Sequence, residues 1–146
     1  MTSGDVHRGS CLCGNVRFEI EGKLGPFGFC HCTSCRKASG TAFTANSSVQ
    51  RVNVRFLSGE ETIKRYESSP GKYRCFCPNC GSPIYKEADD TPGVIRIRLG
   101  ILDTPVGAKP LAHAFWGEKA DWYDDPGGMP VYEAWAPVLK GKVKEE

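Results

Sequence analysis

Eight cysteines, gathered in three short groups, constrain this chain more than any other feature of its sequence. Their spacing is C-x-C in the first group and C-x-C-x-x-C in the second and third. Cysteines so close together are typical of metal sites, whereas a disulfide framework needs an oxidising compartment. Residues 1–10 show no apolar stretch of an export signal, so we expect reduced thiols. The groups are Cys11 and Cys13; Cys30, Cys32 and Cys35; and Cys75, Cys77 and Cys80.

Length and charge exclude several other classes of protein. A chain of 146 residues suits a single domain, which we expect to occupy residues 1–146. The formal net charge of +2 is too small, and Lys and Arg are too scattered, to indicate a nucleic-acid partner. No stretch approaches the roughly 18 consecutive apolar residues of a membrane-spanning helix. We expect a cytoplasmic protein with no membrane or nucleic-acid partner.

Alternation of apolar and polar residues predicts short β-strands along most of the chain. The pattern is clear at residues 11–20, where a metal-binding turn would open the strand, and clearest at residues 93–102. Three shorter extended stretches predict antiparallel strands joined by hairpins. These are residues 42–46, 52–57 and 62–66. Residues 68–71 predict a tight turn because Pro and Gly favour opposite halves of it. The expected fold class is therefore mainly β, with little helix.

The second cysteine group forms a local metal claw. The claw consists of Cys30, Cys32 and Cys35. Thr33 or Ser34 is expected to cap a helical turn within this region, and Gly40 is expected to end it. Three thiols within six positions can grip one ion locally and leave its fourth coordination position undecided.

Two pairs of cysteines complete a separate four-cysteine site. Residues 77–81 have the outline of a zinc knuckle, a tight turn between strands whose second Cys is followed by Gly. Together with Cys11 and Cys13, the two knuckle thiols would close a loop of about sixty residues, for which the entropy of closure is large. Structural zinc can contribute on the order of 10 kcal/mol of folding free energy. The claw then remains as a three-thiol site of the kind found in zinc enzymes.

Cys75 is the one cysteine that belongs neither to the claw nor to the four-cysteine site. On an extended segment it would share a face with Cys77, so it could swing toward the claw and close a second four-cysteine site. It could instead be a buried bystander, since a free Cys behaves as a small apolar side chain. In that case the claw stays open, and the spacing alone does not choose between these outcomes.

Three stretches of the chain resemble the glutathione-dependent formaldehyde-activating enzyme family, also called the Gfa or CENP-V domain family. They are Gly9-Ser10-Cys11-Leu12-Cys13-Gly14-Asn15-Val16, then Phe29-Cys30-His31-Cys32-Thr33-Ser34-Cys35-Arg36-Lys37 with Gly40 and Phe43, then Phe76-Cys77-Pro78-Asn79-Cys80-Gly81-Ser82. Weaker similarity follows at residues 99–103, 113–122 and 130–132. The resemblance covers about residues 9–133, and its cysteine pattern is specific.

The resemblance implies a β-tent fold with two zinc ions per chain. It implies a structural zinc on Cys11, Cys13, Cys77 and Cys80 and a catalytic zinc on Cys30, Cys32 and Cys35. It also implies a carbon–sulfur lyase-type enzyme, similar to S-(hydroxymethyl)glutathione synthase, whose partners are a thiol such as glutathione and a small aldehyde such as formaldehyde. Cys75 falls where the family pattern has no ligand.

Other side chains are weaker candidates. Arg36 and Lys37 follow the claw and could meet the carboxylates of a glutathione-like substrate, although a solvated surface is an equal alternative. His31 should point away from its neighbouring ligands and make a structural hydrogen bond. His113 is expected to be a strand histidine rather than a general base. Asp103 and Trp122 could line a pocket, with core or turn roles as the alternative.

A second class of function stays open beside the enzyme. The same fold could serve as a non-catalytic binding module stapled by two closed four-cysteine zinc sites, as the chromatin-associated branch of the resembled family suggests. The lack of a basic tail argues against that branch. Neither the substrate nor the oligomeric state follows from the sequence, because a fold does not fix a function.

Overall fold

Strands dominate the computed structural model, which describes residues 5–125 and 127–139. One α-helix, α1, spans Thr33–Ser39. The strands are β1 Val6–Ser10, β2 Arg17–Glu21, β3 Phe29–Cys30, β4 Thr44–Gln50, β5 Val54–Ser58, β6 Lys64–Ser69, β7 Lys72–Phe76, β8 Pro83–Ala88, β9 Val94–Arg98 and β10 His113–Ala114. The prediction of a mainly β fold with little helix is confirmed. Within the described residues, no helix is both long enough and apolar enough to cross a membrane.

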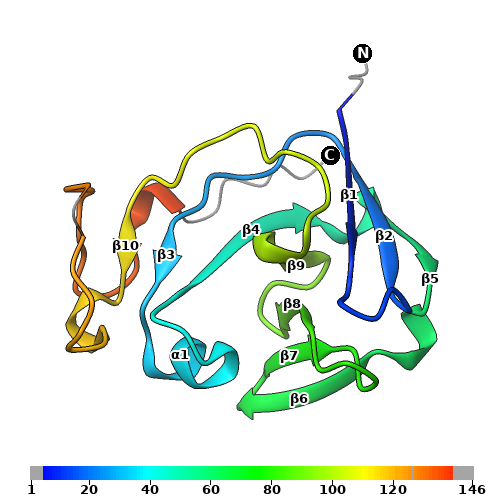
Figure 1. The fold of residues 1–146 in the computed structure, drawn as a ribbon, viewed down its shortest axis with the longest axis horizontal. Helices are drawn as coiled ribbons and strands as arrows, with labels where there is room; N and C mark the ends of the chain where they lie inside the picture. The colour runs from blue at the N-terminus through cyan, green and yellow to red at the C-terminus, as the bar shows by residue number, and fades with distance from the viewer. Residues whose placement is uncertain (1–4, 126, 140–146) are drawn as a thin grey trace.

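The strands are arranged in two sheets. β1, β2 and β5 form a three-stranded sheet, and a seven-stranded sheet has the order β10-β3-β4-β9-β8-β7-β6. Neighbouring strands run antiparallel, except that β10 and β3 are parallel. In Figure 1 the three-stranded sheet lies at one side of the molecule and β10 at the other, with β4 crossing between them. The claw follows β3, so it lies beside the segment that contains β10.

The main core forms where buried faces of the two sheets meet. Phe18 of β2 packs in one cluster with Ile84 of β8 and with Ile95 and Ile97 of β9, and each of them is almost completely buried. Phe18, Ile95 and Ile97 alternate with polar side chains because successive residues of a strand point to opposite faces of the sheet. Gly9 of β1 pairs with Phe18, and a Cβ at this position would collide with the Phe18 ring. The two sheets therefore share one close-packed interior.

The predicted chain of hairpins is wrong for the strands that became β4 and β5. β4 pairs with β3 and β9, whereas β5 pairs with β2 in the other sheet. Short 3-10 turns at Arg51–Asn53 and Glu60–Thr62 separate β4, β5 and β6 along the chain. A two-residue period reveals a strand but not its partner, because long-range packing chooses the partner. The tight turn at residues 68–71 is confirmed, since it joins β6 to β7.

Helix α1 begins at a claw residue rather than at the hydroxyl residues expected to cap it. Cys32 is the N-cap, and its sulfur accepts the backbone N–H of Cys35 at 3.3 Å. The prediction that Thr33 or Ser34 caps the helix is therefore wrong, because the thiol takes the role that a hydroxyl usually fills. Gly40 ends the helix as predicted, with a φ of 73° and its N–H donating to the carbonyl of Arg36.

Removing the Phe18 ring should test the shared core. We expect Phe18→Ala to lower the free energy of unfolding by about 3–5 kcal/mol, because the rigid neighbours cannot fill the cavity. Urea unfolding of the metal-saturated protein measures the change. Val52→Ala, at a side chain that is 85% exposed, is the control and should change the free energy by less than about 0.5 kcal/mol. An equal effect of both substitutions would contradict this description of the core.

Candidate functional site

Four cysteines from two distant turns converge on one point. The sulfur atoms of Cys11, Cys13, Cys77 and Cys80 all lie within 4.8 Å of one another. The Cys11 and Cys13 sulfurs are 3.6 Å apart, and those of Cys13 and Cys77 are 3.9 Å apart. The first turn lies between β1 and β2, and the second lies between β7 and β8. The cluster therefore joins the three-stranded sheet to the seven-stranded sheet.

Both turns place their thiols through backbone hydrogen bonds. The N–H of Gly14 donates to the carbonyl of Cys11 at 3.0 Å, and the N–H of Gly81 donates to that of Cys77 at 2.7 Å. Gly14 and Gly81 have φ values of 81° and 82°, a left-handed conformation that favours glycine. A hydrogen bond from the Ser82 hydroxyl lowers the pKa of Cys80 to about 5. The knuckle geometry predicted at residues 77–81 is present.

The claw thiols converge at a second point. The sulfurs of Cys30, Cys32 and Cys35 lie within 4.8 Å of one another, and those of Cys30 and Cys35 are 3.5 Å apart. β3 delivers Cys30, the N-cap of α1 holds Cys32, and the first turn of α1 carries Cys35. Among the described residues this cluster has three members, whereas the first has four.

The spacing of the sulfurs suits zinc in both clusters. A tetrahedral ion with zinc–sulfur bonds of about 2.3 Å places its sulfur ligands about 3.8 Å apart. The observed separations of 3.5, 3.6 and 3.9 Å lie close to that value. Both clusters could therefore hold a metal ion with small adjustments of the side chains.

Cys75 belongs to neither cluster. It lies on β7 opposite Tyr85, is 1% exposed, and packs among the apolar side chains of the main core. Its sulfur lies 3.9 Å from a carboxylate oxygen of Glu87. Burial, with the nearby charge of Glu87, raises the pKa of the Cys75 thiol to about 11. Of the outcomes that the spacing left open, the structure shows the buried bystander.

Positive side chains face the claw from the seven-stranded sheet. A guanidinium nitrogen of Arg74 lies 3.8 Å from the Cys35 sulfur, and the Lys86 nitrogen lies 4.0 Å from it. Hydrogen bonds with the Cys30 and Cys32 sulfurs, together with the charge of Lys86, hold the pKa of Cys35 well below its usual range. Hydrogen bonds with the Cys32 and Cys35 sulfurs raise the pKa of Cys30. The claw therefore favours negative charge on its most buried sulfur.

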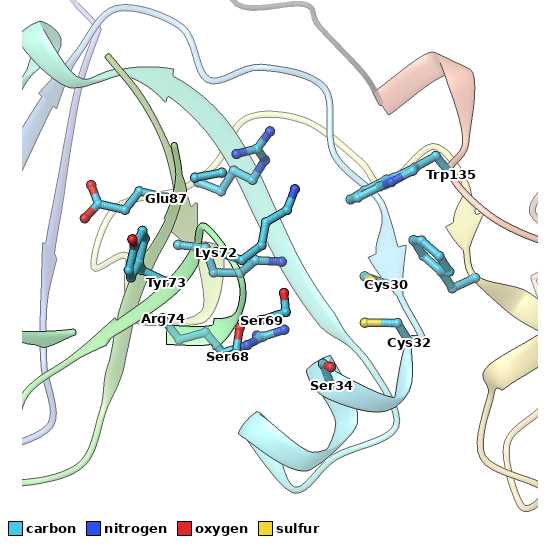
Figure 2. Close-up of a pocket in the computed structure, with 14 residues that line it drawn as sticks. Cys30, Cys32, Ser34, Ser68, Ser69, Lys72, Tyr73, Arg74, Glu87 and Trp135 are labelled. Atoms are coloured by element: carbon cyan, nitrogen blue, oxygen red, sulfur yellow. The ribbon is translucent and has the colours of Figure 1, made fainter. Parts of the chain in front are cut away.

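A cavity of about 280 Å³ opens on the claw. Figure 2 shows the sulfurs of Cys30 and Cys32 at one side of this space and Lys72 and Arg74 at the other. The lining residues are Cys30, Cys32, Ser34, Ser68, Ser69, Lys72, Tyr73, Arg74, Lys86, Glu87, Ala88, Arg96, Phe115 and Trp135. The cavity thus combines thiols, cations and three aromatic side chains, those of Tyr73, Phe115 and Trp135.

Three of the cations form a row across the sheet. Arg74 of β7 lies opposite Lys86 of β8, and Lys86 lies opposite Arg96 of β9. Like charges directly opposite each other destabilise a sheet, so such a row needs compensation by negative charge. The claw compensates Arg74 and Lys86, whereas no ion pair joins Arg96 to any described side chain. Arg96 is the cation that remains for an anionic ligand.

The basic residues that the sequence singled out lie elsewhere. The Nε–H of Arg36 donates to the carbonyl of Glu118, and Lys37 is exposed on α1. Neither is among the described residues that line the cavity. The sequence does not predict the row of cations, because each member is an ordinary strand residue when taken alone. Alternation placed Arg96 on a polar face, but only the register of three strands brings the row together.

The remaining candidates fall outside the cavity. The Nε2 of His31 lies 2.7 Å from the Nδ1 of His113, which confirms a hydrogen bond in place of ligation. Burial, followed by the charge of His113, lowers the pKa of His31 to about 4. Asp103 accepts a hydrogen bond from the Ser10 hydroxyl, and Trp122 is 70% exposed.

Metal content provides a test of the position of Cys75. Because this thiol belongs to neither cluster, we expect Cys75→Ala to bind as many metal ions per chain as the wild type. Cys32→Ala should bind one fewer, because it removes a member of the claw. Elemental analysis after gel filtration measures the ratio. Loss of an ion from Cys75→Ala would show that this thiol turns toward the claw in solution.

Comparison with known proteins identifies the family. The profile of the glutathione-dependent formaldehyde-activating enzyme family matches residues 6–118. A Schizosaccharomyces pombe protein, described as an uncharacterized lyase, is 33% identical over 79 residues, which are 54% of this chain and 56% of that protein. A Halomonas elongata protein, provisionally named a glutathione-dependent formaldehyde-activating enzyme, is 28% identical over 124 residues, covering 80% of this chain and 78% of its own length.

A solved structure shares the fold. A crystal structure of a Rhodobacter sphaeroides protein superimposes with a TM-score of 0.57 at 22% identity, covering 86% of this chain and 99% of that one. The matched family profile includes the claw and the four-cysteine cluster. The chain therefore belongs to the glutathione-dependent formaldehyde-activating enzyme family.

Proposed function

We propose that this protein is a zinc-dependent carbon–sulfur lyase-type enzyme. It would add a thiol such as glutathione to a small carbonyl compound such as formaldehyde, or eliminate the thiol in the reverse direction. The observation that carries the proposal is the three-thiol claw, which opens onto a cavity lined by cations. The name of the family and the lyase description of the yeast relative agree with this class of reaction.

The two cysteine clusters would hold one zinc ion each, with different roles. Cys11, Cys13, Cys77 and Cys80 supply the four ligands of a closed structural site, whereas the claw supplies three ligands and leaves a position for substrate. Bound at the claw, zinc would supply Lewis-acid chemistry that lowers the pKa of an incoming thiol.

The charges around the claw suit an anionic thiol. Three thiolates and one divalent ion leave a net charge of about minus one. Arg74 and Lys86 lie close enough to Cys35 to offset it, and Arg96 and Lys72 remain on the cavity wall. Glutathione carries two carboxylates, for which a guanidinium is a strong bidentate partner. We assign Arg96 as the main carboxylate contact, in place of Arg36 and Lys37.

The reaction itself needs little from the protein beyond positioning. The sulfur of the thiol forms a bond to the carbonyl carbon, the carbon–oxygen double bond becomes single, and the thiol proton is transferred to that oxygen. Elimination reverses each change, so the atoms balance without a further reactant. The aromatic side chains of Phe115 and Trp135 wall the cavity beside Cys30 and Cys32 and would exclude water from the reacting atoms.

The alternative of a non-catalytic module with two closed four-cysteine sites has less support. That alternative needs Cys75 to reach the claw, but its side chain packs in the main core. The described residues offer the claw three thiols and a neighbouring cavity, which favours an open site.

Substitution in each cluster should separate the two roles of zinc. We expect Cys32→Ala to stay folded and lose nearly all activity, because the claw can no longer hold its ion. Cys80→Ala should lower the thermal midpoint strongly, because the structural site closes the long loop between the two turns. Thermal unfolding and the rate of S-(hydroxymethyl)glutathione formation measure the two effects. Full activity of Cys32→Ala would rule out the proposed chemistry.

The role of Arg96 can be tested with two thiols. We expect Arg96→Ala to raise KM for glutathione about tenfold, the effect of losing a charged hydrogen bond, with kcat nearly unchanged. A neutral thiol such as 2-mercaptoethanol has no carboxylate and should react equally well with both proteins. Lys23→Ala, at an exposed loop residue, serves as the control for a lost positive charge. A similar rise in KM for both thiols would remove Arg96 from carboxylate binding.

A further inference from the structure

A buried chain of three polar side chains lies behind the claw, outside the cavity. The Nε2 of His31 lies 2.7 Å from the Nδ1 of His113, and the Nε2 of His113 lies 3.0 Å from a carboxylate oxygen of Asp125. Both imidazoles are 0% exposed, and the Asp125 side chain is 11% exposed. None of the reaction steps proposed above uses these groups, yet His31 lies between two claw cysteines in the sequence.

The carboxylate fixes the direction of the hydrogen bonds. Asp125 also accepts the backbone N–H groups of Gly127 and Met129, at 2.8 and 2.6 Å. Surrounded by donors, it stays ionised, and its oxygen, 3.0 Å from Nε2 of His113, favours a proton on that nitrogen. A neutral His113 then presents a bare Nδ1, which accepts the Nε2–H of His31. We assign both tautomers from this network.

Aromatic rings enclose the two imidazoles. His31 lies 5.3 Å from Phe43, 5.0 Å from Trp116 and 5.3 Å from Tyr123 between ring centroids. In so apolar an enclosure a lost hydrogen bond is expensive, because no water replaces the missing partner. The orientation of the His31 ring therefore depends on the His113 bond.

The backbone at the same place links the claw to the cavity wall. The N–H of His31 donates to the carbonyl of Ala114 at 3.0 Å, and the N–H of Phe115 donates to that of Ala134 at 2.7 Å. Phe115 and Trp135 are two of the aromatic residues that line the cavity. His31 is thus attached to the β10 segment by both its side chain and its backbone.

We propose that Asp125 and His113 are positioning residues that act through His31 to direct the sulfurs of Cys30 and Cys32 toward their metal. Asp125 keeps His113 in one tautomer, His113 holds the His31 ring, and the ring fixes the peptide between the two cysteines. The inference rests on the claw being a metal site, as in the proposed function. It does not require that the bound metal be catalytic.

Two substitutions at position 113 discriminate this role from loop anchoring. In His113→Asn the amide occupies the place of Nδ1 and can still bond His31, but it cannot reach Asp125. In His113→Gln the amide occupies the place of Nε2 and can still bond Asp125, but it leaves His31 unpaired. We expect His113→Gln to weaken metal binding at the claw by about 10–100-fold, the usual effect of losing a supporting hydrogen bond. His113→Asn should stay within about threefold of wild type, well below that range.

Cobalt substitution provides a readout that is independent of activity. Chelator competition measures the affinity of the claw, and the thiolate-to-cobalt absorption bands report its geometry. We expect the four-cysteine cluster to bind cobalt in the same molecule, so that its bands report whether each variant is folded. If His113→Gln matches the wild type, or His113→Asn is the weaker of the two, the chain only anchors the loop and the proposal is overturned.

A double-mutant cycle tests the part played by Asp125. We expect Asp125→Asn to weaken the claw about tenfold in the wild-type background and to have no further effect in His113→Asn, which has no tautomer to fix. Equal effects in both backgrounds would overturn the assigned role. Asp124→Asn, an exposed neighbour, is the control for the lost charge. Normal claw binding without lyase activity in the wild type would instead contradict the proposed function and leave this inference standing.

Discussion

The convergence of four thiols from two distant turns holds the two sheets of this protein together. Cys11 and Cys13 belong to the turn after β1 in the three-stranded sheet, and Cys77 and Cys80 to the turn after β7 in the seven-stranded sheet. With this junction in place, the buried faces of β2, β8 and β9 pack into one interior. The same junction orients β7 and β8, which carry Arg74 and Lys86 toward the claw. The position of the four-thiol cluster therefore influences the charges around the claw.

Two groups of side chains surround the claw, and they act on it in different ways. On the cavity side, a row of cations compensates its negative charge and leaves Arg96 for an anionic ligand. At His31, buried imidazoles and aromatic rings hold the peptide between Cys30 and Cys32. The row of cations acts through its charge and favours anionic ligands in the cavity. The imidazoles and aromatic rings act through their packing and restrict the directions in which the Cys30 and Cys32 sulfurs can point.

Much of the fold class and the grouping of the thiols could be predicted from the sequence. The spacing of the cysteines separated a four-thiol cluster from a three-thiol claw, because ligands two or three residues apart converge through local turns alone. Alternation located most strands for the same reason, since the direction of a side chain on a strand is a local property. The pairing of the strands could not be predicted in this way. β4 and β5 lie close in the sequence, yet they belong to different sheets.

The amino-acid sequence alone was sufficient for the local features: which thiols can form turns around an ion, where strands run, and that Gly40 ends the helix. The long-range features required the folded chain. In the folded chain Cys75 lies in the core. Arg74, Lys86 and Arg96 form one row across three strands. Asp125 lies beside His113. Each of these depends on strand register or on contacts between segments distant in the sequence. Such contacts follow from the packing of the whole chain, and no short stretch of sequence encodes them.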